Sequence, residues 1–382
     1  MINRDRVTGQ FLDLVRISSP SGREGEVARY LGPVLRDLGA SVEVDDAGAQ
    51  AGSDTGNVLA RIPATDPNAP PLFICGHMDT VVPCEHVRPV VEGDVVRTDG
   101  TSVLGGDDKA AIVAILEAVR VLGEQRIAHG AIELLFTICE ENGLLGAKAF
   151  DVGRLTARTG LVLDCDGVDE LITRAPATNH MRFIVHGHEA HAGIAPEQGI
   201  SAIKVAAEAV AAMRLGRVDA ETSANLGRIE GGLATNIVPN QVTLRGEARS
   251  LTVSGLEKQT EHMTACFEEA AARHRARIGA REYRARVETQ VVRSCEPLDV
   301  PADARIVRLL ARSAAGLDRP FRTRSTGGGS DANVFSQRGI EIANLACGMR
   351  EIHTVHEWVD VRDLVSTSRL LVEACRLNAS VS

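Results

Sequence analysis

The sequence predicts an α/β protein of two domains, in which a smaller α+β domain interrupts a larger one built on a mainly parallel sheet. Two patterns carry this prediction. Short apolar runs alternate with helical patterns in the first half of the chain, as parallel sheets require. Farther along, the elements follow the order βαββαβ of ferredoxin-like domains. The length of 382 residues also exceeds that of one ordinary hydrophobic core.

The larger domain is defined by its apolar runs. Residues 71–76 and 131–139 are predicted strands, and the short run at 160–163 is another. Residues 108–122 carry apolar side chains at helical spacing. From residue 301 onward the pattern returns to helix, glycine-rich turn, strand and helix. This β–α–β rhythm predicts a sheet with helices on its faces.

The inserted domain begins near residue 179 with a predicted strand at 181–185. A helix, two strands, a helix and a strand follow at residues 200–215, 224–229, 242–249, 256–274 and 281–290. We therefore predict an inserted domain of residues 179–293, and a larger domain of residues 1–178 and 294–382.

Composition narrows the classes of function. The formal net charge of −9 argues against a nucleic-acid partner, which would favour a basic surface. No segment approaches the roughly 20 apolar residues of a membrane span, and the N-terminal segment lacks the apolar core of a signal peptide. The eight cysteines include no Cys-x-x-Cys pair and are predicted to be mostly buried free thiols. We therefore expect a cytoplasmic protein.

Polar side chains follow the three predicted strands of the first half, at the edge where open parallel sheets bind ligands. They are His77 and Asp79, Glu140 and Glu141, and Asp164. Carboxylates at the ends of buried strands are unfavourable unless positive charge compensates them. A pair of divalent metal ions is the simplest compensation for so many. The sequence therefore predicts a two-metal hydrolase site at this edge.

Two of these pairs suggest a division of roles. Asp79 lies two residues after His77, so both side chains project to one side of an extended chain and the carboxylate can hold the second ring nitrogen. Of the adjacent Glu140 and Glu141, one can ligate a metal while the other acts as a general base for bound water.

Other metal ligands are open choices at this level. Asp107-Asp108 opens a predicted helix, where one carboxylate is expected to cap the helix and the other could bridge two metals. Residue type and spacing do not decide between the members of two further pairs, Asp164 and Asp166, and His353 and His356.

Three features of the sequence are candidates for substrate binding. His191 of the inserted domain could donate to the oxyanion of a tetrahedral intermediate. Arg249 could pair with a substrate carboxylate or form a salt bridge within the fold. The glycine-rich residues 326–331 lack the Lys-Ser/Thr of a phosphate loop and suggest either a close approach of backbone to substrate or a flexible turn.

These motifs resemble the co-catalytic zinc exopeptidase family that includes peptidase T, carboxypeptidase G, the aminoacylases and succinyl-diaminopimelate desuccinylase. Six stretches stand in the family's order and rough spacing, at residues 76–80, 104–109, 140–143, 190–193, 235–239 and 328–331. The resemblance covers nearly the whole chain. The Gly-Asp-Asp-Lys form and residues 164–170 point toward the peptidase T-like branch.

The resemblance implies two zinc ions, with cobalt or manganese as possible substitutes. His77 and Asp164 would hold one ion, Glu141 and His353 the other, and Asp107 would bridge both. A cis peptide often follows this bridging residue in the family. The family's histidine ligand lies four residues before a glutamate, which favours His353 over His356. The family's spacing also favours Asp164 over Asp166.

Further roles follow from the same resemblance. Glu140 would be the general base and Asp79 would orient His77. The substrate or its oxyanion would be bound by His191, Asn236, Arg249, Gly328 and Gly329.

The expected activity is hydrolysis of an amide bond in short peptides by a peptidase T-like aminopeptidase. A carboxypeptidase or N-acyl-amino-acid hydrolase is the alternative, with an acylated amino acid as substrate. A catalytically silent binding protein would show missing ligands, yet every ligand position is filled. In relatives the inserted domain often acts as a lid and dimerises, so a homodimer is expected.

Overall fold

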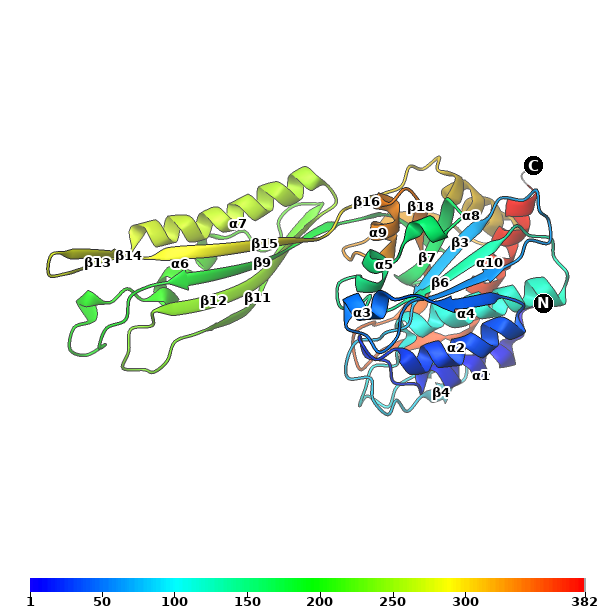
Figure 1. The fold of residues 1–382 in the computed structure, drawn as a ribbon, viewed down its shortest axis with the longest axis horizontal. Coiled ribbons are helices and arrows are strands. Elements are labelled where there is room, and N and C mark those ends of the chain that lie inside the picture. Colours follow the sequence, from blue (N-terminus) through cyan, green and yellow to red (C-terminus); the bar gives the residue numbers. More distant parts are fainter. Residues whose placement is uncertain (381–382) are drawn as a thin grey trace. The chain divides into compact units, whose positions relative to one another are not determined.

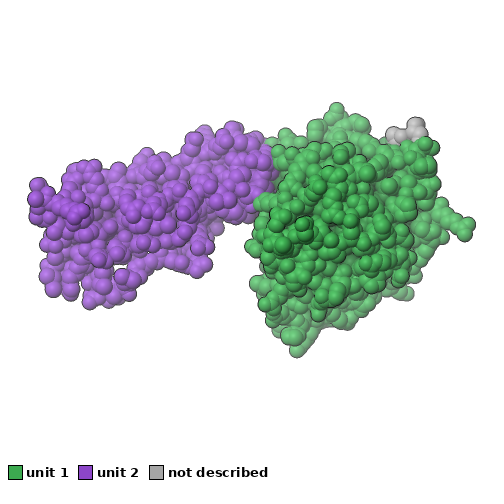
Figure 2. Space-filling model, in the orientation of Figure 1, with its two compact units in different colours: residues 1–174, 298–326, 330–382 green, residues 175–297, 327–329 purple. Residues whose placement is uncertain are grey.

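The computed structural model describes residues 1–380, which form two compact units (Figures 1 and 2). Unit 1 contains residues 1–174, 298–326 and the chain from residue 330 onward. Unit 2 contains residues 175–297 and 327–329. Within residues 1–380, no helix combines the length and apolar character needed to cross a membrane. All eight cysteines are free and buried, as predicted.

The centre of the unit 1 sheet is parallel, as predicted. Its strands are, in spatial order, β6 (Ile132–Thr137), β3 (Leu72–His77), β7 (Thr159–Asp166) and β18 (Glu341–Arg350). Antiparallel strands extend one edge through β2 (Val58–Ile62) and β1 (Ser41–Val44), and the other through β19 (Trp358–Asp360), β5 (Val95–Arg97) and β4 (Val90–Glu92). Three strands branch off beside β18, namely β8 (Glu170–Ala175), β16 (Leu298–Asp299) and β17 (Arg322–Ser325). Strands β3 and β6 are buried throughout, and most of their residues are apolar.

Helix α4 (Gly106–Glu124) is the central helix of unit 1 and corresponds to the predicted helix at 108–122. It packs against strands β3, β7 and β18 and against helices α1 (Arg4–Val15) and α10 (Val361–Ala379), as Figure 1 shows. Apolar residues on all its sides explain this burial. Unit 1 also contains the α-helices α2 (Gly25–Asp37), α3 (Ala47–Ala51), α5 (Leu145–Ala149), α8 (Arg305–Gly316) and α9 (Asp331–Gln337).

Unit 2 has the predicted βαββαβ order. Its elements are β9 (Ala177–His186), α6 (Ala202–Ala212), β11 (Thr222–Gly231), β12 (Gln241–Ser250), α7 (Val253–Arg273) and β15 (Arg286–Cys295). The sheet order is β10-β11-β12-β9-β15, where β10 (Gly216–Arg217) is a short edge strand, and every pair is antiparallel. Both helices pack on one face, where the rings of Phe183 and Phe267 stack with centroids 4.3 Å apart.

The strand predicted at residues 281–290 was wrong in its bounds. The chain instead forms a separate hairpin of β13 (Arg275–Ile278) and β14 (Arg281–Arg284), and β15 begins at Arg286. Gly279 allows the hairpin turn because it adopts a φ of 59°. Charged residues occur on both sides of the break between β14 and β15, so the sequence pattern does not mark it.

Candidate metal centre

The polar residues predicted to follow the strands meet at the carboxyl ends of the parallel strands in unit 1. His77 is the last residue of β3, and Asp164 lies near the end of β7. Glu140 and Glu141 follow β6, and Asp107 lies at the start of α4. Four separate elements therefore deliver side chains to one place, as expected for ligand sites of parallel sheets.

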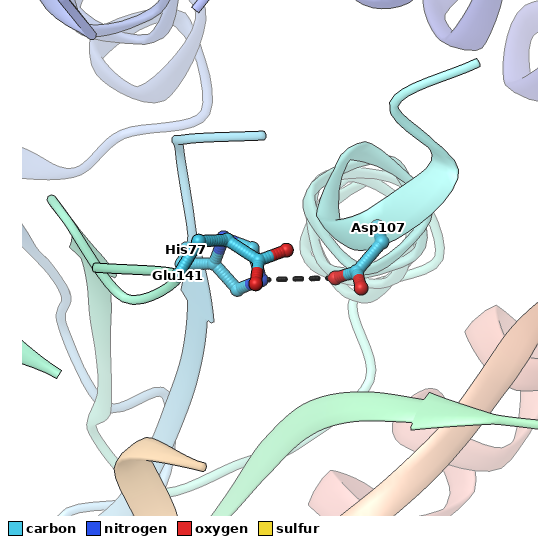
Figure 3. A group of neighbouring side chains, drawn as sticks. All are labelled: His77, Asp107 and Glu141. Atoms are coloured by element: carbon cyan, nitrogen blue, oxygen red, sulfur yellow. Dashed lines mark hydrogen bonds and ion pairs between the residues drawn. The ribbon is translucent and has the colours of Figure 1, made fainter. Parts of the chain in front are cut away.

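Asp107 lies between two histidines. Its Oδ1 is 3.0 Å from His77 Nε2 and its Oδ2 is 3.1 Å from His353 Nε2. Figure 3 shows His77 and Glu141 facing this carboxylate. His353 Nε2 also lies 2.9 Å from Glu141 Oε1, and His77 Nε2 lies 3.8 Å from Asp164 Oδ1. One carboxylate thus offers an oxygen to each of two imidazoles, which is the arrangement a bridging ligand needs.

The donor atoms fall into two overlapping groups. The ligand atoms of His77, Asp107 and Glu141 lie within 4.8 Å of one another, as do those of His77, Glu140 and Asp164. Glu140 therefore lies within reach of the same centre as the expected ligands. Its carboxylate is buried, whereas the side chain of His353 is half exposed.

The contacts of each side chain distinguish Asp164 from Asp166, and His353 from His356. Asp164 faces His77, whereas the Asp166 carboxylate lies 2.7 Å from the Arg324 guanidinium. His353 faces Asp107 and Glu141. The exposed His356 has an amide that donates to the Thr354 hydroxyl, 3.1 Å away. The geometry therefore brings Asp164 and His353 into the cluster.

Electrostatics favour cations at this centre. Burial raises the pKa of Glu140 well above its usual value, and the Asp164 carboxylate adds to the rise. Burial also raises the pKa of Asp164 and of Glu141. Burial opposes a charged His77, yet hydrogen bonds with Asp107, Asp164 and Asp79 hold the pKa of His77 well above its usual range. Divalent ions among these groups would stabilise the carboxylates as anions, and imidazole and carboxylate donors suit zinc, cobalt and manganese. The residues fit a two-metal group.

Asp79 contributes more than its predicted contact with His77. His77 Nδ1 lies 2.9 Å from the Asp79 carbonyl oxygen and 3.4 Å from its carboxylate. The carboxylate also accepts hydrogen bonds from the amides of Glu140 and Glu141, at 2.9 and 3.2 Å, and from the Ser21 hydroxyl at 2.6 Å. Asp79 therefore fixes the turn that carries both glutamates.

Glu24 was missed by the sequence analysis. This buried carboxylate accepts the Cys139 amide at 3.0 Å and the Gly22 amide at 2.8 Å. Together with Asp79 it binds three consecutive amides, those of residues 139–141. Nothing in the sequence marks Glu24, because its partner lies 115 residues away and is a backbone group.

The start of α4 is held differently from the prediction. The expectation that Asp107 or Asp108 caps the helix was wrong, because α4 has no side-chain cap. Asp108 Oδ2 instead accepts the His77 amide at 3.0 Å, and a Cβ atom at Gly76 would lie only 2.8 Å from that oxygen. Glu357 binds the start of the helix by accepting the amides of Gly105 and Asp107, both at 2.8 Å. The expected cis peptide is present between Asp107 and Asp108.

Asn344 and Thr137 support the same centre. The Asn344 amide group donates to the Asp164 carbonyl at 2.7 Å and accepts the Asp164 amide at 2.8 Å. The Thr137 hydroxyl donates to Asp331 at 2.6 Å. Asp331 is buried, and its burial raises its pKa to about 7. Strand-end residues are thus fixed by side chains from distant segments.

The expected substrate-binding residues His191, Asn236 and Arg249 belong to unit 2. The backbone of His191 bridges to that of Ile237, and the Ala192 amide donates to the Asn236 carbonyl at 2.9 Å. These contacts bring the His191 and Asn236 segments side by side.

Arg249 forms the salt bridge within the fold that the sequence left as an alternative. Its guanidinium pairs with Glu247 at 2.9 and 3.1 Å. Its Nη1 also donates to the Gly327 carbonyl at 3.2 Å. Arg249 therefore lies beside the glycine-rich segment that contains Gly328 and Gly329.

His191 has a defined tautomer in this arrangement. Its Nδ1 accepts hydrogen bonds from the amides of Gly193 and Ile194, each at 3.1 Å. Because a neutral imidazole carries one proton, that proton lies on Nε2. The exposed side chain therefore presents an N–H donor.

The chain belongs to Peptidase family M20/M25/M40, whose family model matches residues 73–376. The fold and the site thus define a peptidase, in agreement with the predicted resemblance. The chain is similar to the aminopeptidase PepT from Bacillus cereus ATCC 10987, with 40% identity and a TM-score of 0.89 over 99% of both chains. A tripeptidase from Staphylococcus aureus subsp. aureus mu50 shares 34% identity, with a TM-score of 0.93 over 100% of both chains. Protein YqjE of Bacillus subtilis (strain 168) is 42% identical over 97% of this chain and 98% of its own length. These relatives place the chain in the peptidase T-like branch.

Proposed function

We propose that this protein is a two-metal aminopeptidase that removes the N-terminal residue from short peptides, tripeptides above all. The observation that carries the proposal is Asp107, whose two carboxylate oxygens each face a histidine, 3.0 and 3.1 Å away. His77 and Asp164 would hold one ion, and Glu141 and His353 the other. The similarity to PepT and to the tripeptidase supports this class of substrate.

When bound, the two ions, zinc by preference and otherwise cobalt or manganese, would lower the pKa of a shared water and polarise the scissile carbonyl. The chain's own residues supply the remaining steps. Glu140 accepts the proton of the attacking water and later delivers it to the leaving amine. Asp79 and Glu24 keep Glu140 in place by binding the amides of residues 139–141.

Unit 2 would supply the groups that recognise substrate. The Nε2–H of His191 is a donor for the oxyanion that forms as water adds to the carbonyl. Asn236 and the backbone of Gly328 and Gly329 would bind the peptide, and Arg249 would reach a terminal carboxylate by exchanging one of its contacts with Glu247. Movement of unit 2 as a lid would bring these groups to the metal centre.

A comparison of two tripeptides tests the choice of terminus. We expect the metal-loaded enzyme to cleave a free-amine tripeptide such as Ala-Ala-Ala. It should cleave the N-acetylated form at least about 100-fold more slowly, because an aminopeptidase recognises the charged α-amino group. Rates are measured by chromatography of the released amino acid, with chelator as the blank. Faster cleavage of the acetylated peptide would instead identify a carboxypeptidase or an N-acyl-amino-acid hydrolase.

We also propose a cytoplasmic homodimer that contacts neither nucleic acid nor membrane. Large apolar side chains on the surface of unit 2 support self-association there, since Ile194, Leu233 and Ile229 are 79%, 77% and 59% exposed. Light scattering on the purified protein measures its molar mass. We expect the mass of a dimer, and the mass of a monomer at micromolar concentration would contradict the proposal.

A further inference from the structure

The face of the unit 2 sheet opposite helices α6 and α7 carries a row of cationic side chains. Met181 and Phe183 of β9 belong to the core beneath the helices, so Arg182, which alternates with them, points to the other face. Leu244 of β12 likewise belongs to the core, which directs Arg245 to the same open face.

The strand register sets these arginines directly opposite one another. Arg182 pairs with Arg245, and Arg245 pairs on its other side with Arg228 of β11. Neighbouring strands lie only about 4.7–4.9 Å apart, and like charges in directly opposed positions destabilise a sheet. The row continues to Gln290 of β15, which pairs with Arg182. These residues lie far apart in the sequence and become neighbours only when the strands pair.

Two of the three arginines lack an acidic partner. Arg228 forms an ion pair with Glu230. Among residues 1–380, by contrast, no side chain forms an ion pair or a hydrogen bond with the guanidinium of Arg182 or Arg245. The Nε of Arg182 is buried and lacks any hydrogen-bond partner, which is an unfavourable state for a charged donor.

The same two arginines line a hollow in the sheet face. His180, Gln290 and Val292 also line it, together with Met181 and Gly246. No carboxylate lines the hollow. The nearby Glu247 is engaged by Arg249. Glu247 also lies 4.0 Å from His180 at the border of the hollow, but no carboxylate contacts Arg182 or Arg245 among residues 1–380. The hollow therefore offers hydrogen-bond donors and positive charge at these two arginines.

We propose that this hollow is a binding site for a doubly charged oxyanion of the phosphate class, either inorganic phosphate or the phosphoryl group of a small molecule. Two guanidinium groups match the charge of such an ion, and their planar forks match its oxygens. The ion would relieve the repulsion between Arg182 and Arg245 and satisfy the buried Nε of Arg182. The Gln290 amide supplies a further donor.

Inorganic phosphate is the first probe, added to the metal-loaded, full-length protein. We expect phosphate to raise the melting temperature saturably, beyond the effect of chloride at the same ionic strength. Arg182→Gln and Arg245→Gln should each weaken phosphate binding at least tenfold by calorimetry. Arg217→Gln, which changes an exposed arginine on β10, is the matched control and should bind phosphate normally.

A second binding experiment with glycerol phosphate distinguishes inorganic phosphate from the phosphoryl group of a small molecule. Binding of both compounds identifies the phosphoryl group as the ligand, and binding of inorganic phosphate alone identifies the free ion. Succinate that binds as tightly as phosphate would overturn the assignment. So would a phosphate effect that survives both substitutions and disappears with the metals, because that phosphate would lie at the metal centre.

Stability without phosphate gives an independent readout. Because Arg245→Gln removes a like-charge contact, this variant should melt at or above the temperature of the unmodified protein in phosphate-free buffer, and below it when phosphate saturates the unmodified protein. A variant that melts lower in both buffers would show that Arg245 supports the fold and not a ligand.

Discussion

Glu140→Gln should lower kcat for a tripeptide by about 100- to 10,000-fold, the usual contribution of a general acid–base group. Glutamine keeps the volume of the side chain and one oxygen, but it cannot take a proton from water. The amide of residue 140 would still donate to Asp79, so the turn should keep its shape. Metal content by mass spectrometry should stay at two ions per chain, and KM should change little.

The control for this variant is Glu85→Gln, which changes an exposed glutamate outside the centre and should leave kcat within about twofold. Activity of Glu140→Gln near that of the control would remove Glu140 as the base. Loss of one metal ion would be a different result. It would make Glu140 a ligand, a role its position beside His77 and Asp164 allows.

The meeting of the polar side chains at one metal centre could be predicted because it depends on local sequence patterns. Strands β3 and β6 are largely apolar runs. His77 is the last residue of β3, and Glu140 and Glu141 follow closely after the end of β6. Parallel strands share a carboxyl edge, so once the strands are recognised, their polar neighbours must meet. No detail of packing is needed for this step.

The supports of the centre could not be predicted because they depend on tertiary contacts. Glu24 binds an amide 115 residues away, and Glu357 binds amides 250 and 252 residues away. A backbone amide has the same chemistry at every position, so no residue type marks the partner. The capping prediction at Asp107-Asp108 failed for the same reason, since Glu357 and His77 engage the groups that local rules assign to the helix end.

Unit 2 shows a second limit of local reasoning. Its strands alternate polar and apolar residues, so the order βαββαβ is readable. The register between strands is not, and register alone sets Arg182 opposite Arg245. Similarly, Arg249 could be predicted as a charged group at a strand end, but its contacts with Glu247 and Gly327 required the folded chain.

His353→Ala should remove one of the two metal ions and lower kcat at least about 100-fold, because a ligand contributes at least as much as the groups that orient it. His356→Ala is the matched control: it changes a histidine three residues away, in the same loop, and should leave metal content and kcat close to normal. The opposite outcome, with the larger loss at His356, would reverse the assignment drawn from the contacts of His353 with Asp107 and Glu141.

The number of protons released on metal binding is a second measurement that distinguishes His353→Ala from His356→Ala. Hydrogen bonds that His353 donates to Asp107 and to Glu141 raise its pKa to about 10, so the metal-free protein carries an imidazolium there at neutral pH. A metal must displace that proton, so its binding should release protons and should strengthen as pH rises from 6 toward 8. Calorimetry in buffers of different ionisation enthalpy measures the release. His353→Ala should release fewer protons per metal bound than His356→Ala, because only the first substitution removes a proton that competes with the ion.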